Sequence, residues 1–336
     1  MNGSIEELIT AKKHFSKMGW FYVAAVAALY LVEGPLGFVV SLLRPEWVGD
    51  GNITVLLSMI PMYCVAFPLL IFLMKKMVPA VKLEKHKMTA GQYVLSAVIC
   101  LGLAYASNIF GNILTFLIGA FKGGLVENQI ASLAESLHPA MILIYMVICA
   151  PVMEEYIFRK LIVDRTVRYG QGTAVVVSGL MFGLFHGNLN QFVYAAVIGM
   201  FLAFLYVKTG DLRITISLHM LFNFVGGFLS SLLFRAIDLE GYLAAAEEGE
   251  FQSIISYMSE HIAGWVLYGI FLLFVIGMLV TGLVLFIVFA AKRRFALEKG
   301  EVTLPRGLRA NLVLANSGML VFGLYWIVQI MLQLME

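Results

Sequence analysis

The chain has 336 residues, of which 61% are hydrophobic and 13% are charged, and its mean hydropathy is +0.90. This composition excludes an ordinary soluble globular protein and is typical of a protein that crosses a membrane several times. The net charge at pH 7 is only +2, and no run of basic residues predicts binding to nucleic acid.

Nine apolar segments follow one another along the chain. A helix needs about 20 apolar residues to cross the hydrocarbon core of a bilayer. The segments comprise residues 18–43, 54–74, 93–121, 138–158, 173–187, 191–207, 214–235, 262–291 and 309–334. We therefore predict an all-α, polytopic membrane protein that forms a single membrane domain over residues 1–336, with about nine transmembrane helices.

Lysine and arginine residues predict the orientation of these helices, because they are enriched on the cytoplasmic side of membranes. If nine helices alternate from a cytoplasmic N-terminus, only Arg44, Lys122 and Arg235 of the 23 basic residues fall on the outer side. The outer side also receives the long acidic connection 236–261. We therefore predict an N-in, C-out topology, since one helix more or fewer would remove this asymmetry.

The third segment contains two asparagines in otherwise apolar surroundings. Asn108 and Asn112 are four residues apart and therefore share a helix face. Amide side chains within a membrane hydrogen-bond to neighbouring helices. We expect this pair to join its helix to another one.

The fourth segment ends in the sequence Glu154-Glu155-Tyr156-Ile157-Phe158-Arg159. Glu155 and Arg159 are four residues apart and can pair on one helix face, whereas Glu154 faces elsewhere and is free to act as a general base. Pro151 lacks an N–H, so it is expected to free backbone groups close to these carboxylates. The alternative is a solvated helix end whose basic residues anchor it at the membrane interface.

Two histidine motifs follow on the next helices. Phe182 and His186 share a helix face, and a histidine can serve as a base, an electrophile or a metal ligand. His219 and Asn223 also share a face, and both can donate hydrogen bonds towards one point, which suits the stabilisation of an oxyanion. The alternatives are a histidine at the lipid interface and a polar pair that joins two helices.

The fifth segment decides whether these groups can meet. A rise of about 1.5 Å per residue places Glu154 and His219 near the cytoplasmic end, and His186 at the far end of a full span. The fifth segment has only about 15 residues, however, which is short for a span. We therefore predict that the hairpin 173–207 stops short of the outer surface, and that the site lies in a water-filled cavity open to the cytoplasm.

Together and in this order, the three motifs resemble the signature of the CPBP family of intramembrane proteases, also called the Abi family or the type II CAAX prenyl endopeptidases. Its members carry Glu-Glu-x-x-x-Arg, Phe-x-x-x-His and His-x-x-x-Asn, or a near variant, on successive helices, and all three patterns occur here without departure. The resemblance covers roughly residues 138–228. It implies a four-helix catalytic core, formed by the fourth to seventh helices, within the membrane domain.

The resemblance also implies an activity, namely hydrolysis of a peptide bond in a membrane-associated protein or peptide, lipidated or not. Glu154 matches the catalytic glutamate, which activates water with the help of His186. His219 and Asn223 match the pair that stabilises the oxyanion. The other motif residues are expected to support the site; they are Glu155, Arg159 and Phe182.

Two cofactor hypotheses remain open at this point. Glu154, His186 and His219 could form a zinc site with an open position for water. The chain has no His-Glu-x-x-His motif, however, and the two histidines come from different helices. Asn223 is an unusual zinc ligand and a good oxyanion donor. We therefore favour a metal-free glutamate protease and keep zinc as the alternative.

A membrane transporter and a non-catalytic scaffold are the alternative functions. In a transporter the same residues would form a proton relay or a substrate site, but the sequence lacks the paired broken helices of many transporters. A scaffold could lose Glu154 or His219 without cost, whereas every motif position is kept. We expect the bilayer to be a bacterial cytoplasmic membrane, because no sorting signal is present.

Overall fold

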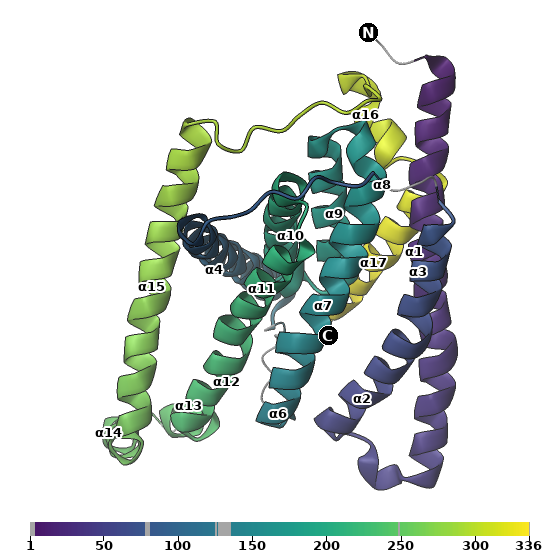
Figure 1. The fold of residues 1–336 in the computed structure, drawn as a ribbon. Helices are drawn as coiled ribbons and strands as arrows, with labels where there is room; N and C mark the ends of the chain where they lie inside the picture. Colours follow the sequence, from purple (N-terminus) through teal and green to yellow (C-terminus); the bar gives the residue numbers. More distant parts are fainter. Residues whose placement is uncertain (1–3, 78–80, 125, 127–135, 248, 336) are drawn as a thin grey trace.

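The protein is a bundle of helices, most of which run between the two ends of the molecule (Figure 1). The computed structural model describes residues 4–77, 81–124, 126, 136–247 and 249–335. Within these ranges the regular structure is helical and no strand is present. The prediction of an all-α, polytopic membrane protein is confirmed.

Eight helical stretches in the described ranges are long and apolar enough to span a membrane. They are α1 (Ile5–Leu43), α2 to α3 (Gly51–Lys75), α4 (Ala90–Lys122), α6 to η5 (Pro139–Tyr169), α10 (Leu189–Thr209), α11 to α12 (Leu212–Ala236), α15 (Ile262–Ala291) and α17 (Ser317–Met335). The remaining elements are shorter: η1 (Pro45–Trp47), α9 (Gln171–Phe185), α13 (Leu239–Glu247), α14 (Phe251–Glu260) and α16 (Arg306–Val313). With α9 as the short ninth apolar helix, these elements correspond to the nine predicted segments.

Three of these spans include π-helical turns, in which a backbone N–H bonds to the carbonyl five residues earlier. The second span consists of α2 (Gly51–Pro61), η2 (Met62–Ala66) and α3 (Phe67–Lys75). The fourth consists of α6 (Pro139–Met141), η3 (Ile142–Cys149), α7 (Ala150–Glu154), η4 (Glu155–Val163), α8 (Asp164–Thr166) and η5 (Val167–Tyr169). The span that follows α10 consists of α11 (Leu212–Asn223), η6 (Phe224–Leu229) and α12 (Ser230–Ala236). Because π turns are rare and concentrate at functional sites, the fourth span is of particular interest.

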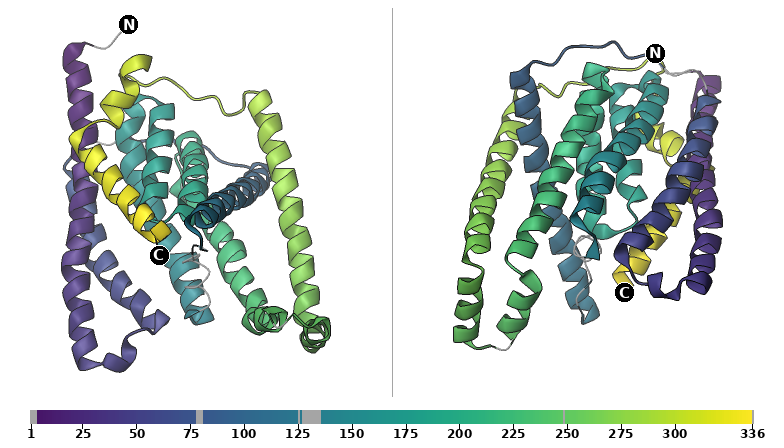
Figure 2. Two further views of the ribbon diagram at one scale, coloured as in Figure 1. Left: turned by 180° about the vertical axis from the view of Figure 1, so that it is seen from behind. Right: turned by 60° about the horizontal axis from the view of Figure 1, so that its bottom comes forward.

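The connections that the basic residues assign to one side of the membrane lie together in space. The N-terminal end of α1, the segment 81–89 and the linker 292–305 lie at one end of the molecule, and α13 and α14 lie at the other (Figures 1 and 2). This arrangement is the one required by helices that alternate in direction. The assignment of the first end to the cytoplasm stays a prediction from the charges.

The first and last spans pack against each other. Gly19 and Gly318 allow α1 and α17 to approach closely, and the Ser16 and Ser317 hydroxyl oxygens are 3.0 Å apart. From this position α17 also reaches α9 (Figure 2, left). Two segments at opposite ends of the sequence thus flank the helices that carry the motifs.

The hairpin formed by α9 and α10 is short on the α9 side, as predicted. Its 15 residues span about 22 Å at 1.5 Å per residue, against about 30 Å for a hydrocarbon core. The α9–α10 turn ends against α4, where the Asn190 side-chain amide donates to Asn112 Oδ1 at 3.0 Å. This bond joins α10 to α4, so the expected asparagine contact between helices is confirmed; within α4, Asn112 also donates to Asn108 at 3.0 Å.

The turn between α10 and α11 has a sequence that suits a sharp reversal. Gly210 ends α10 with φ of +61°, and a side chain there would collide with the Glu84 carbonyl oxygen. The Asp211 carboxylate then caps α11 by accepting from the N–H of Arg213. This turn fixes the start of the helix that carries His219.

Candidate active site

Glu155 and Arg159 form an ion pair at the centre of the molecule. Both side chains are fully buried, and Arg159 Nε lies 3.1 Å from Glu155 Oε2. The pair lies within η4, so the four-residue spacing brings the two groups together as predicted. A buried charge of this kind is costly unless it is paired. The pairing therefore explains how this helix tolerates both residues.

His219 of α11 lies between the two glutamates. Its Nδ1 is 2.9 Å from Glu155 Oε1, and its Nε2 is 3.6 Å from Glu154 Oε2. The Glu155 side chain is completely buried, whereas the Glu154 side chain is 20% exposed. One carboxylate is thus held by its neighbours, and the other keeps an accessible edge.

Phe182 of α9 contacts the arginine and both histidines of this cluster. The Arg159 guanidinium lies 4.3 Å from the centroid of its ring, an attractive cation–π arrangement. The rings of His186 and His219 lie 4.8 Å and 5.7 Å from it, both edge-on. Phe182 therefore sets the spacing between the two histidines and the arginine.

His186 follows the last residue of α9 and is only half-buried. Its Nδ1 lies 2.8 Å from the Phe182 carbonyl oxygen. Because a carbonyl only accepts, Nδ1 carries the hydrogen of this bond, and in the neutral ring Nε2 then has a free lone pair. Among the described residues, the histidine that lies within 4 Å of the Glu154 carboxylate is His219.

The turn after His186 is supported by the last span. Gly187 has φ of +67°, and the Trp326 ring of α17 lies directly against it, 3.1 Å from where a Cβ would stand. Trp326 also packs on Phe185, with ring centroids 5.1 Å apart. Gln333 of the same helix accepts from the Leu189 N–H at 3.3 Å. Sequence analysis did not assign these α17 residues to the site, because no motif marks them.

Asn223 occupies the last position of α11, one turn after His219. Its side-chain amide donates to the Met146 carbonyl oxygen of η3 at 2.7 Å. It therefore contacts the same span as the two glutamates, and it does so through the backbone. Whether its remaining N–H serves an oxyanion stays a prediction.

The structure brings together six of the seven predicted site residues through direct contacts. These are Glu154, Glu155, Arg159, Phe182, His186 and His219. Asn223 joins the group through Met146. The contact between His219 and Glu155 is one that sequence analysis did not anticipate.

Zinc stays the alternative to a metal-free site. No group of three or more histidine, cysteine, aspartate or glutamate side chains is arranged to hold a metal ion, as far as the described residues extend. Nδ1 of His219 is bonded to Glu155, and Nδ1 of His186 is bonded to a carbonyl. Both histidines therefore keep Nε2 as the ring nitrogen that remains for a water molecule or a metal ion.

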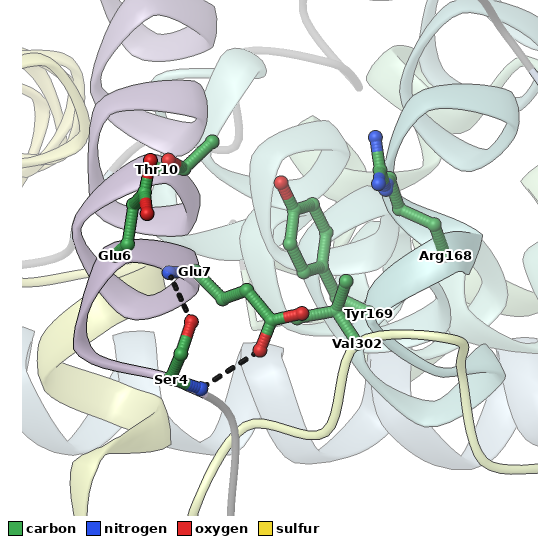
Figure 3. Close-up of a pocket in the computed structure, with 7 residues that line it drawn as sticks. All are labelled: Ser4, Glu6, Glu7, Thr10, Arg168, Tyr169 and Val302. Atoms are coloured by element: carbon green, nitrogen blue, oxygen red, sulfur yellow. Dashed lines mark hydrogen bonds between the residues drawn. The ribbon is translucent and has the colours of Figure 1, made fainter.

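Two cavities of the protein lie away from this cluster. The first, of about 210 Å³, lies at the start of α1, where Tyr169 stands between Glu7 and Arg168 (Figure 3). It is lined by Ser4, Glu6, Glu7, Thr10, Arg168, Tyr169 and Val302. The second, of about 380 Å³, is an apolar groove between α15 and the span that carries His219. The water-filled cavity expected around the site stays a prediction.

Residues 136–225 match the family model described as "Type II CAAX prenyl endopeptidase Rce1-like". This part of the chain is similar to that family. It contains all three motifs, and it overlaps the core expected at 138–228. The family recognised from the motifs is thereby confirmed.

A curated relative supports the same assignment. The chain is 26% identical over 165 residues to "Putative membrane peptidase YdiL" of Bacillus subtilis (strain 168). The alignment covers 47% of this chain and 66% of the relative, slightly less than two thirds of its length. No solved structure matches the chain.

Proposed function

We propose that the protein is an intramembrane endopeptidase of the CAAX type, which hydrolyses a peptide bond of a membrane-associated protein or peptide. One observation carries this proposal: His219 contacts Glu155 and Glu154 at once, although it lies on a different helix. A purely structural ion pair would need only Glu155 and Arg159, and it would not require Glu154 or His219. The second carboxylate, with its exposed edge, is then available for chemistry.

In the proposed reaction Glu154 acts as the general base. It takes a proton from a water molecule, and the resulting hydroxide attacks the carbonyl carbon of the scissile peptide bond. The Nε2 lone pair of His186 helps to orient that water. The proton is then returned to the amine leaving group as the tetrahedral intermediate collapses. No metal takes part in this proposed reaction.

The negative charge of the intermediate requires hydrogen-bond donors. We assign this role to His219, whose Nδ1 bond to Glu155 directs Nε2 towards Glu154 and the reaction centre. Glu155 in turn is held by Arg159. The Glu155 carboxylate, fixed by Arg159, therefore orients the imidazole.

The substrate and the membrane are proposed at the level of class. The matching family is described as a type II CAAX prenyl endopeptidase. For this chain we propose the broader class of membrane-associated polypeptides, lipidated or not. Because the matched relative is a bacterial protein, we propose the bacterial cytoplasmic membrane as its location.

The test is cleavage of a peptide library by the purified protein, followed by mass spectrometry. Glu154→Gln is expected to abolish cleavage and to leave the unfolding temperature unchanged, since its side chain is partly exposed. Glu33→Gln is the matched control, because Glu33 is also a glutamate within a span and accepts a hydrogen bond from the Ser58 hydroxyl. Cleavage by Glu154→Gln at the wild-type rate would refute the proposed role of Glu154.

A further inference from the structure

The fourth span has a break in its backbone hydrogen bonding just before Glu154. At the end of η3 the Ala150 N–H donates to the Tyr145 carbonyl, five residues earlier. In the same register, the next bond would run from residue 151 to the Met146 carbonyl. Residue 151 is a proline and has no N–H. The Met146 carbonyl is therefore left without its backbone partner.

Asn223 supplies the missing donor. Its side-chain N–H donates to the Met146 carbonyl oxygen at 2.7 Å, a short and well-formed bond. An unpaired carbonyl at membrane depth is costly, because the bilayer provides no water to solvate it. The proline and the asparagine are thus complementary: the first exposes an acceptor, and the second satisfies it from another helix.

The same span is held at two further carbonyls by side chains from other helices. The Tyr22 hydroxyl of α1 donates to the Ile157 carbonyl at 2.9 Å. The Ser178 hydroxyl of α9 donates to the Phe158 carbonyl at 2.8 Å. Three neighbouring helices therefore hold this π-containing span through its backbone, and Asn223 is the donor before the glutamates.

We infer that Asn223 is a positioning residue, which acts on the reaction through Met146 and not by contact with the substrate. It fixes the span that carries Glu154 against the helix that carries His219. The relative position of these two helices sets the distance of 3.6 Å between Glu154 Oε2 and His219 Nε2. The inference rests on the proposed function, and it gives Asn223 a role other than the oxyanion donor.

A double-mutant cycle between Asn223 and Pro151 tests the inference. Asn223→Ala is expected to lower kcat, measured per folded molecule, by about 10- to 100-fold through misplacement of the base. Pro151→Ala restores a backbone N–H for the Met146 carbonyl. In that background Asn223→Ala is therefore expected to lower kcat by less than about threefold. Pro151→Leu restores the same N–H and serves if the alanine variant does not fold.

The other outcomes overturn the inference. An equal loss of kcat in both backgrounds means that Asn223 contacts the reacting groups directly. If the effects of the Asn223 and Pro151 substitutions are non-additive in the unfolding temperature but additive in kcat, the bond from Asn223 to the Met146 carbonyl has only a structural role. Peptide cleavage by the Glu154→Gln variant tests the proposed function separately. A failure of the proposed function is therefore distinguished from a failure of this inference.

Discussion

The Nδ1 atom of His219 lies 2.9 Å from Oε1 of Glu155, although the two residues are 64 positions apart in the sequence. This contact joins the helix of the third motif to the helix of the first. Glu155 offers its other oxygen to Arg159, so a fully buried carboxylate connects an imidazole and a guanidinium. Arg159 balances its charge, and His219 bonds its other oxygen.

Removing one member of the buried ion pair is expected to destabilise the protein strongly. Arg159→Met leaves the Glu155 charge unpaired, and Glu155→Gln leaves the Arg159 charge unpaired. Each single variant is expected to lose about 3 to 5 kcal/mol of unfolding free energy. The measurement is thermal unfolding in detergent.

The double variant Glu155→Gln/Arg159→Met provides the control for this prediction. It removes both charges and keeps an oxygen that accepts from His219. It is expected to be more stable than either single variant. Additive losses would show that the pair is not the reason for the instability of the singles.

Replacement of Phe182 is expected to impair catalysis more than stability. Phe182→Leu keeps most of the buried volume but removes the ring face below Arg159 and the ring contacts with both histidines. We expect kcat to fall by about 10- to 100-fold, measured by peptide cleavage. Phe201→Leu, at a buried phenylalanine outside this cluster, is the matched control, and an equal loss in both variants would contradict the role of Phe182.

A methyl group at Gly187 is expected to disturb the turn that carries His186. Gly187→Ala places a side chain on a residue with φ of +67° and presses it against Trp326. The left-handed conformation alone costs about 1 to 2 kcal/mol, and we expect reduced cleavage together with a lower unfolding temperature.

Gly277→Ala is the comparison for this variant. Gly277 lies within helix α15, and a Cβ there would meet no atom within 4 Å. It is expected to gain about 0.5 to 1 kcal/mol, as alanine does relative to glycine inside a helix. If both variants change stability in the same direction, the strain assigned to the Gly187 turn is refuted.

Chelation is expected to leave cleavage unchanged. Because no group of three histidine, cysteine, aspartate or glutamate side chains among the described residues is arranged to hold a metal ion, we expect a rate within about twofold of the untreated enzyme after dialysis against a strong zinc chelator. Metal analysis of the same sample completes the measurement. Stoichiometric zinc, with cleavage that is lost on chelation and restored by zinc, would overturn the metal-free mechanism.

Several features of the fold and the site follow from local sequence rules. The Glu155–Arg159 pair follows from their spacing, and the short α9 from the length of its apolar segment. The contact between His219 and Glu155 could not be predicted in the same way, because helix facing depends on packing and on the π turns of η4. The role of the Met146 carbonyl depends on a hydrogen-bond register that only coordinates reveal.

The support that α17 gives to the His186 turn has a consequence for biosynthesis. During translation the motif-bearing helices emerge from the ribosome well before α17 does. Until Trp326 inserts beneath Gly187, the turn that carries His186 lacks its support on that side. A nascent chain therefore holds an unfinished turn at the candidate site until α17 has entered the bilayer.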